Sequence, residues 1–413
     1  MRFRNARYRA SCRSGQTVIL AVLLFPALLA VLGLVLDGGM LYQVKRRMQA
    51  AADAAALAGT WELWRGNSSL AASAARDDAR LNGFNHGVNA SVTVNNPPTS
   101  GSWASNAGYV EVIISRDVPA TIMRIVGRQS STVRARAVAG MQKFMDFCLL
   151  ALHPTLSGAM IVQGNSSLTA GCGVMVDSNA ADALQLGGGA CINGTVVGVT
   201  GGWTALGTIG CIYPQPETGV PPFLDPLAYL TPPPIPSTPV ANRLNMTGGN
   251  ATLSPGLYQN GLDIQSGSVT FQPGIYIIDG GFHIGGGAVA RCDGCMFYIT
   301  NLGGAWGRVQ IDGSAVINFV APDSGPYEGV LIWMDRNAPD RPPGSFIAGV
   351  PGSKFEGALY FPSVHLSLGG TNNSANWTMA IADTIDIQGD ARFPGDPDVS
   401  TVTPPTRKPT LVE

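Results

Sequence analysis

The pattern of hydrophobic and polar positions divides the chain into three parts. Residues Thr17 to Leu36 form an apolar run that contains Pro26 and no charged residue. Beyond Gly39, apolar positions recur every three or four residues, which is the spacing of one helix face. Beyond Phe144 the chain changes to short alternating runs separated by Gly, Asn and Ser, which predicts short strands joined by tight turns. The expected order is an apolar helix, an amphipathic helix with a small domain, and a long β region.

The apolar run predicts a single membrane-spanning helix, with residues 1–15 as a basic cytoplasmic tail and residues 16–37 as the anchor. A helix of 20 residues at about 1.5 Å per residue covers the roughly 30 Å hydrocarbon core of a bilayer. Arginines are frequent before the run, which favours an amino terminus inside the cytoplasm and the bulk of the chain outside it. The alternatives are a buried soluble helix and a cleaved signal peptide, whose apolar core is usually about 7 to 15 residues. We interpret the run as an uncleaved signal anchor.

The helix that continues beyond the anchor carries a stripe of small side chains. Its apolar positions include Ala51, Ala55 and Ala58, and small side chains allow two helices to approach closely. The stripe has two interpretations, which are packing against related helices and covering its own domain. A second helix and three strands are expected to follow, at 68–81, 90–94, 109–115 and 133–138. Together these elements predict one α+β domain over residues 38–141.

The same stretch resembles the amino-terminal segment of a known family. The string from Ala51 to Gly59 reads Ala-Ala-Asp-Ala-Ala-Ala-Leu-Ala-Gly, and it follows the apolar run and the pair Arg46-Arg47. This combination resembles the TadG-like proteins of the TadE/TadG group, which is encoded with tight-adherence (Flp, type IVc) pili. Prepilin substrates typically carry Glu at the fifth position after the cleaved Gly. Here that position after Gly15 is Leu20, which favours TadG-like over TadE-like members.

The resemblance implies a location, partners and a function. It implies a pilin-like stalk over residues 38–141, held at the bacterial inner membrane by a single span, with the bulk of the chain in the periplasm. It also implies partners among other pilus-assembly or pilin-like proteins. The expected role is a non-enzymatic structural or assembly protein of a Flp (tight-adherence) pilus or of its secretion apparatus.

Residues 142–395 are expected to form a parallel β-helix, which is a solenoid of stacked strands. A strand, a glycine turn and a second strand recur at intervals near 20 to 27 residues, with no long helical pattern between them. A β-sandwich is the alternative. The proline-rich segment 214–240 cannot supply regular ladder donors, so it is expected to form an extended strap. The Pro-rich residues 396–413 are expected to be a disordered tail.

Six of the seven cysteines lie beyond the anchor and are candidates for disulfide bonds. Cys172, Cys191 and Cys211 are spaced by about one turn of a solenoid, and equivalent residues of adjacent turns lie about 4.7 to 4.9 Å apart. Disulfides need Cα atoms about 4.4 to 6.8 Å apart, so bridges between turns are allowed. The expected pairs are Cys148 with Cys172, Cys191 with Cys211, and Cys292 with Cys295. For the last pair, free thiols and a metal or redox site are the alternatives.

Charge and composition argue against several classes of function. Only 13% of the residues are charged and the net charge is −1, so a basic face for binding nucleic acid is not expected. The four histidines are scattered along the sequence, which leaves little material for a metal centre, and no cofactor is expected. Parallel β-helices can also host glycan-active enzymes, which use clustered acidic and basic side chains. The candidates for such a site are Asp312, Asp335, Arg336, Glu356 and Asp386.

We therefore predict a mainly β protein, in which a transmembrane helix and a pilin-like α+β stalk precede a parallel β-helix. The predicted mechanism is interaction, through lateral helix packing at the membrane and an extended β surface for partners. A membrane-tethered glycan-active β-helix enzyme and an adhesin-like surface module are the alternatives. Convergence of the five acidic and basic candidates in one groove would favour the enzyme.

Overall fold

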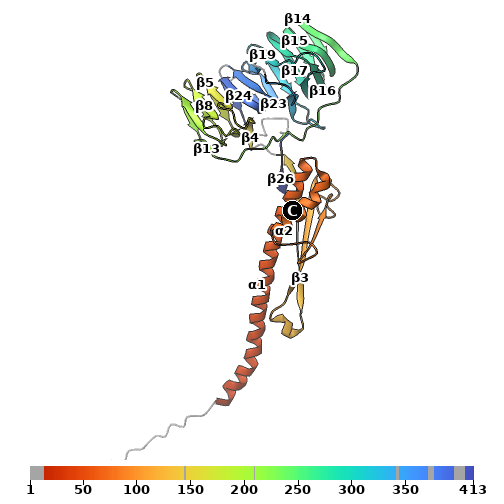
Figure 1. The fold of residues 1–413 in the computed structure, drawn as a ribbon, viewed down its shortest axis with the longest axis vertical. Coiled ribbons are helices and arrows are strands. Elements are labelled where there is room, and N and C mark those ends of the chain that lie inside the picture. Colours follow the sequence, from red (N-terminus) through yellow and green to blue (C-terminus); the bar gives the residue numbers. More distant parts are fainter. Residues whose placement is uncertain (1–13, 144–145, 209, 341–343, 371–375, 395–404) are drawn as a thin grey trace, which may run out of the picture. The chain divides into compact units, whose positions relative to one another are not determined.

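The computed structural model of the chain describes residues 14–143, 146–208, 210–340, 344–370, 376–394 and 405–413. The protein is mainly β, with one long helix at the amino-terminal end of the described chain (Figure 1). Contacts between residues divide it into two compact units, Met1–Gln142 with Pro409–Glu413 and Lys143–Lys408. Of the predicted basic tail, residues 1–13 lie outside the described residues.

The described part of the first unit combines helices with a four-stranded sheet. Its helices are α1 (Ser14–Trp64), η1 (Ser68–Leu70), α2 (Ala71–Leu81) and η2 (Met123–Val126). Its strands are β1 (Ser91–Asn95), β2 (Tyr109–Pro119), β3 (Ser130–Lys143) and β26 (Arg407–Leu411), in the order β1-β2-β3-β26. β1 and β3 each pair antiparallel with β2, so that Ser91 lies opposite Ser115 and Tyr109 lies opposite Gly140.

The carboxyl-terminal half of α1 forms the core of this unit together with α2 and one face of the sheet. Successive side chains of a strand point to opposite faces, so every second residue of β2 can face the helices. The side chains that meet in this core are mostly small or β-branched, and they include Ala52, Ala55, Ala56, Ala75, Ala79, Val110, Val112 and Ile114. The alanines let the helices lie close to the strands.

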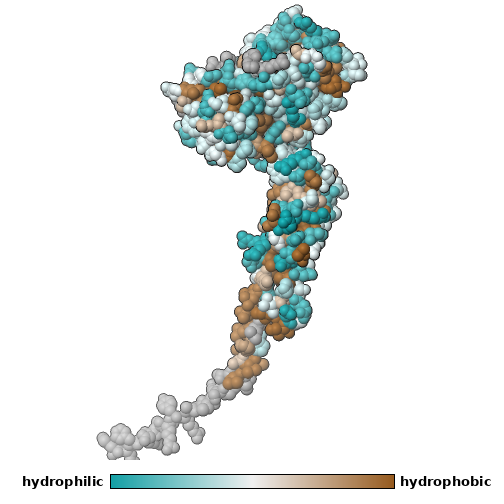
Figure 2. Space-filling model, in the orientation of Figure 1, coloured by the Kyte–Doolittle hydropathy of each residue, from teal (hydrophilic) through white to brown (hydrophobic). Residues whose placement is uncertain are grey.

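The amino-terminal half of α1 carries its apolar side chains on the surface. Val22, Phe25 and Leu28 are between 63% and 66% exposed, and Figure 2 shows this part of the helix in brown. Among the described residues, one helix is long and apolar enough to cross a membrane, and it covers Ala21–Trp64. Pro26 lies inside this helix, and proline is tolerated in helices that lie in lipid.

The second unit is built on one 22-stranded sheet whose described pairings are parallel. Its first strands are β4 (Phe147–Ala151), β5 (Met160–Gln163), β6 (Ser167–Ala170), β7 (Gly173–Val176), β8 (Leu184–Gly187), β9 (Cys191–Asn193), β10 (Val197–Val199), β11 (Trp203–Leu206), β12 (Cys211–Tyr213) and β13 (Glu217–Thr218). The later strands are β14 (Pro239–Leu253), β15 (Gly256–Phe271), β16 (Gly274–Asp279), β17 (Phe282–Asp293), β18 (Cys295–Thr300), β19 (Val309–Ile311), β20 (Val316–Val320), β21 (Val330–Met334), β22 (Ser345–Gly349), β23 (Lys354–Gly370), β24 (Asn376–Gly389) and β25 (Ala391–Phe393).

The strands of this unit do not stack in simple sequence order. β4, β7 and β10 are successive layers, and so are β14, β15 and β17. β24 pairs with β23 on one side and with β4 and β5 on the other, so the last strands lie beside the first. β13 and β14 are therefore at opposite ends of the stack. The proline-rich residues 219–238 join them, and an extended segment of that length reaches roughly 60 Å at about 3.1 Å per residue.

Alternate residues of these strands face two different apolar clusters. One row runs through Ile277, Tyr298, Trp333 and Tyr360 on β16, β18, β21 and β23. The side chains of this row form one cluster with Leu227 and Leu230 of the proline-rich segment. The neighbouring row, which includes Tyr276 and Phe297, faces the larger cluster on the other side of the strands. Both faces are covered, which explains why β18 and β21 are buried along their whole length.

The last residues of the chain differ from the expected disordered tail. Arg407–Leu411 form β26 at the edge of the first unit's sheet, next to β3. The backbone of Val138 donates to the carbonyl of Glu413 at 2.9 Å and accepts from the N–H of Val412 at 2.9 Å. The edge of β3 thus supplies backbone hydrogen-bond partners to the end of the chain, which the composition of the tail does not reveal. An edge strand also tolerates Pro409, because its missing N–H is not needed there. Of this tail, residues 396–404 lie outside the described residues.

Candidate functional site

α1 contains the residues predicted to anchor the chain and to pack helices together. The predicted anchor was marked by Thr17, Pro26 and Leu36, and all three lie in α1. Ala51 and Ala55 are buried by the unit's own sheet and by α2, whereas Ala58 is half-buried. Of the two interpretations of the alanine stripe, the arrangement therefore favours a helix that covers its own domain.

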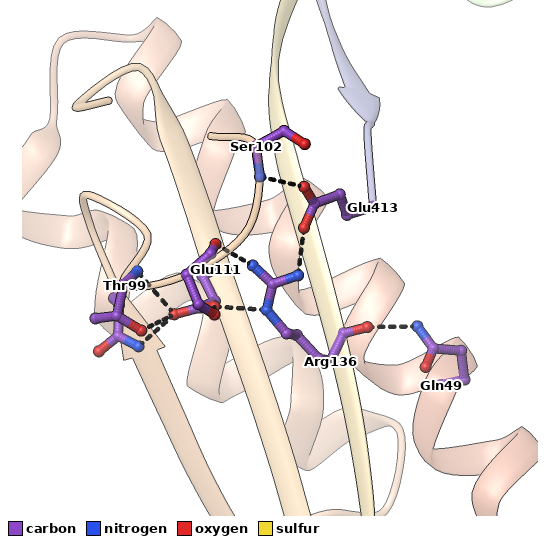
Figure 3. A network of polar contacts seen from close by, with 8 residues as sticks. Gln49, Thr99, Ser102, Glu111, Arg136 and Glu413 are labelled. Atoms are coloured by element: carbon purple, nitrogen blue, oxygen red, sulfur yellow. Dashed lines mark hydrogen bonds and ion pairs between the residues drawn. The ribbon is translucent and has the colours of Figure 1, made fainter. Parts of the chain in front are cut away.

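A polar network next to this stripe centres on Glu111 of β2 and Arg136 of β3 (Figure 3). The Nε of Arg136 donates to Glu111 at 2.6 Å, and the same guanidinium forms an ion pair with the carboxylate of Glu413. Thr99 donates to Glu111 through its N–H at 3.1 Å and its hydroxyl at 2.7 Å. Gln49 of α1 donates to the backbone carbonyl of Arg136 at 2.8 Å. The network therefore joins both central strands to α1 and to the end of the chain.

The charge of Glu111 is held in place by its hydrogen-bond donors. Burial acts to raise the pKa of this fully buried carboxyl group, but donors on Thr99, Asn95 and Arg136 outweigh it and lower the pKa to about 2. Glu111 is therefore ionised at neutral pH and carries no proton to transfer. The contacts of this network hold the strands, α1 and the end of the chain together in the first unit.

Three disulfide bonds cross-link the described residues of the second unit, and they join the pairs expected from the sequence. Cys191 of β9 lies opposite Cys211 of β12, with Cα atoms 4.5 Å apart. Cys148 of β4 is bonded to Cys172, which comes directly before β7, with Cα atoms 5.7 Å apart. The Cys292–Cys295 bond closes the short turn between β17 and β18. The first two bonds connect neighbouring layers of the stack.

The second unit also carries a groove of about 530 Å³ over β14, β15, β17 and β19. Polar, aromatic and charged side chains line it, including Arg243, Asn245, Asn260, Asp263, His283, Trp306, Arg308 and Gln310. Arg243 and Asn245 are exposed at its edge, whereas Trp306 packs against the apolar core. An aromatic ring among hydrogen-bonding groups is the arrangement that suits a neutral polar ligand such as a sugar.

A row of polar side chains crosses the groove at equivalent positions of three strands. Asp263, His283 and Gln310 lie opposite one another on β15, β17 and β19. The Nδ1 of His283 lies 2.7 Å from Asp263, and its Nε2 lies 3.5 Å from Asp312. Gln310 donates to Asp312 at 3.0 Å and accepts from Arg308 at 2.8 Å. The row can offer several fixed donors and acceptors to a bound molecule.

Two neighbouring candidates from the sequence make structural contacts: Asp335 with strand β18, and Arg336 with the proline-rich segment. Asp335 accepts from Tyr298 at 2.6 Å and from Thr300 at 2.8 Å, and it is buried. Arg336 donates to the backbone carbonyls of Leu227 at 2.7 Å and of Leu230 at 2.8 Å. Its guanidinium also lies over the rings of Trp333 and Tyr360. These contacts fasten the segment to the sheet.

The remaining candidates are engaged elsewhere, apart from Asp312. Glu356 of β23 is buried and lies 2.5 Å from the ammonium of Lys354. Asp386 of β24 is buried and accepts from Gln388 at 2.6 Å. The five candidates therefore have different partners, and among them only Asp312 contacts the polar row, through His283 and Gln310. Within the described residues, no group of three or more His, Cys, Asp or Glu side chains is arranged to hold a metal ion.

Sequence reasoning missed the polar row, although a signal for it exists. The tripeptides Leu262-Asp263-Ile264, Phe282-His283-Ile284 and Val309-Gln310-Ile311 each place one polar residue between two apolar ones. In the structure these tripeptides are aligned residue for residue across three parallel strands. An alignment of the repeats by their apolar positions would have placed Asp263 and His283 at equivalent positions, and so predicted that they are neighbours on adjacent strands.

Comparison with known proteins finds a match at the amino-terminal end. The model of the Tad family, described as Flp pilus-assembly TadE/G-like, matches residues 15–77. These residues include the apolar run, the buried half of α1 and the first part of α2. No curated protein and no solved structure matches the chain.

Proposed function

We propose, starting from the TadE/G-like domain at residues 15–77, that the protein is a membrane-anchored structural or assembly component of a Flp pilus or of its secretion apparatus. The single observation that carries the proposal is this family match. The matched residues include almost all of α1, with both its apolar run and its buried alanines. The role is non-enzymatic and depends on contacts with other pilus-assembly or pilin-like proteins.

The location that we propose is the bacterial inner membrane, with the amino terminus in the cytoplasm and the chain beyond residue 37 in the periplasm. Two features support it. Arginines precede the apolar run, and the flank of a membrane helix that is rich in Arg and Lys normally stays in the cytoplasm. The disulfide bonds of the second unit suit an oxidising compartment.

In this proposal the second unit is a parallel β-helix that presents a rigid surface to partners. Parallel pairing between segments about 20 residues apart, as between β9 and β12, supports this description. The bonded cysteines on neighbouring layers would keep such a surface intact outside the cell. The fold would then separate two tasks, with attachment in the first unit and recognition in the second.

The proposal is tested by genetics in the bacterium that encodes the chain. Deletion of the gene is expected to abolish Flp pili on the cell surface, as counted by electron microscopy, and the full chain should restore them. A matched version, in which a cleavable signal peptide replaces residues 1–37, should reach the periplasm without restoring pili. Normal piliation of the deletion strain would contradict the proposal.

A glycan-binding surface module is a second candidate for the second unit. The groove with Trp306 and the polar row of Asp263, His283 and Gln310 favours it. Trp306→Ala should then abolish binding to a glycan array, whereas Trp203→Ala on β11 should not. Cleavage of the bound glycan would instead support the glycan-active enzyme.

A further inference from the structure

The hairpin between β2 and β3 extends along α1 toward the apolar run. β2 ends at Pro119, β3 begins at Ser130, and the short helix η2 lies between them. Antiparallel pairing continues to the last residues of both strands, because Pro119 lies opposite Ser130. The paired strands therefore hold both ends of the hairpin tip, which is residues 120–129.

A carboxylate of α1 holds this tip in place. Asp37 directly follows the apolar run, and its side chain is buried. Its carboxylate accepts the backbone N–H groups of Thr121 at 3.0 Å, Ile122 at 3.0 Å and Met123 at 2.8 Å. Such charge-assisted hydrogen bonds fix the position of the tip along the axis of α1, next to the end of the apolar run.

One side chain of the tip reaches past Asp37 into the apolar run itself. A Cβ atom added to Gly33 would lie 2.6 Å from the Cγ2 of Ile122, so the isoleucine occupies the space beside this glycine. Gly33 precedes Asp37 by one helical turn, which is about 6 Å along the helix axis. The tip therefore lies at the level where the apolar surface of α1 ends.

The rest of the tip presents an apolar side chain flanked by cations. Ile125 is 84% exposed, and Arg124 and Arg128 are exposed on either side of it. No described ion pair involves either arginine. An exposed aliphatic side chain between two guanidinium groups is the pattern of a segment that lies in the interface of an anionic bilayer.

We propose that the tip of the β2–β3 hairpin is a second membrane contact, in which Ile125 enters the bilayer surface around α1 and the two arginines bind lipid phosphates. The occupant is the phospholipid leaflet on the side of the membrane that carries the folded units, because the tip is continuous with the apolar run. This inference rests on the proposed membrane anchoring. Together with α1, the contact would fix the tilt and rotation of the first unit on the membrane.

The test measures the depth of single fluorescent labels in the full chain. Cys12→Ser removes the one cysteine outside the disulfides, and Ile125→Cys then carries an environment-sensitive fluorophore. The protein is reconstituted in vesicles of phosphatidylethanolamine and phosphatidylglycerol that contain lipids with a quenching doxyl group near the headgroup. Val88→Cys is the matched control, because Val88 is also apolar and 78% exposed but lies between α2 and β1.

The proposal predicts that doxyl lipid quenches the label at residue 125 at least about threefold more than the label at residue 88. Equal quenching at the two positions would overturn it. Replacing phosphatidylglycerol by phosphatidylcholine should reduce the quenching at residue 125, and unchanged quenching would overturn the role of Arg124 and Arg128. Protection of the label from aqueous iodide without quenching by doxyl lipid would indicate a protein contact and would also overturn the proposal.

A third label separates this inference from the anchoring on which it rests. Leu28 is 66% exposed in the apolar run, so Leu28→Cys should be quenched by doxyl groups placed deep in the acyl chains. Quenching at residue 28 without quenching at residue 125 would refute the second contact alone. Absence of quenching at residue 28 would refute the membrane anchor itself.

Discussion

Replacing Glu111 by Gln tests how far the buried network of β2 and β3 stabilises the first unit. The substitution keeps the shape of the side chain but removes its charge. It leaves Arg136 with only Glu413 as an ion-pair partner among the contacts of Figure 3, and it turns one acceptor oxygen into a donor that faces other donors. Thr99 and Asn95 then lose an acceptor inside the protein.

The magnitude follows from the pKa of Glu111. Folding lowers this pKa from its ordinary value of 4.5 to about 2. At about 1.4 kcal/mol per pKa unit, a difference of about 2.5 units corresponds to about 3 kcal/mol of stabilisation. Because the folded-state pKa is the lower one, this stabilisation is fully present above about pH 5 and is lost as the pH falls through 2. The variant should lack it at every pH.

The assay follows each unit separately in the full chain. The protein is held in lipid nanodiscs and equilibrated in urea at a chosen pH. A short pulse of hydrogen exchange then labels the unfolded molecules, and mass spectrometry measures the label in peptides of β2 and β3. At pH 7 the Glu111→Gln variant should unfold in these peptides with a free energy about 2 to 4 kcal/mol below wild type. Peptides of the second unit serve as the internal reference and should be unaffected.

The pH dependence of stability provides the sharper comparison. Glu111 in the first unit and Asp177 in the second unit have pKa values shifted in opposite directions. Between pH 5 and pH 2.5 the first unit of the wild type should lose stability. The variant should lose less, although it should still lose some, because hydrogen bonds from Arg136 and Ser102 still hold the pKa of Glu413 below its ordinary value. In the second unit, burial raises the pKa of Asp177 to about 6, so protonation of Asp177 should add stability to that unit as the pH falls from 7 to 4.

The control for Glu111→Gln lies on the same strand. Asp117 is exposed on β2 and accepts a hydrogen bond from Thr132 at 2.5 Å, so Asp117→Asn should cost less than about 0.5 kcal/mol. An equal effect of the two variants at pH 7, or the same pH dependence in wild type and Glu111→Gln, would refute this account of the network.

Three further changes should weaken specific connections. Asp37→Ala removes the acceptor for three backbone N–H groups of the hairpin tip, so amide exchange there should speed up by about tenfold or more in mass-spectrometric measurements. Replacing both Cys191 and Cys211 by Ser should lower the free energy of unfolding of the second unit by about 3 kcal/mol in urea titrations, because the bond closes a loop of 20 residues. Arg336→Ala should free the segment 214–238 for limited proteolysis, since its carbonyl partners lose their donor.

Each of these changes has a reference measurement. Asp53→Asn alters another carboxylate of α1 and should leave the hairpin tip unaffected. Adding dithiothreitol should lower the stability of the wild-type second unit at least as far as the cysteine replacement does. Arg243→Ala removes an exposed arginine and should not change the proteolysis pattern. If Asp37→Ala matches Asp53→Asn, or Arg336→Ala matches Arg243→Ala, the corresponding connection is disproved. If the cysteine replacement is as stable as untreated wild type, the contribution of the Cys191–Cys211 bond is disproved.

The sequence predicted those features that depend on local pattern. The apolar run, a helix within 68–81 and the strands β1, β2 and β3 each follow from the spacing of apolar residues, and the structure contains them. The cysteine pairs follow from a separation of about one layer, as for Cys191 and Cys211. These predictions needed only distances along the chain and the geometry of regular elements.

Features that depend on distant partners could not be predicted in this way. β26 is a strand because the edge of β3 lies beside it, although the composition of residues 396–413 indicated disorder. Asp335 and Arg336 have the chemistry of a catalytic pair, yet their partners on β18 and in the proline-rich segment make them structural. The return of β24 to β4 could not be seen in a local pattern either, since it joins segments more than 200 residues apart.

The most direct test of the central claim is the position of the chain across the membrane. In cells with a permeable outer membrane, a maleimide that cannot cross the inner membrane should label Val88→Cys without lysis. It should label Cys12 of the wild type only after lysis. Labelling of both positions only after lysis, or recovery of the intact chain in the soluble fraction, would contradict the account.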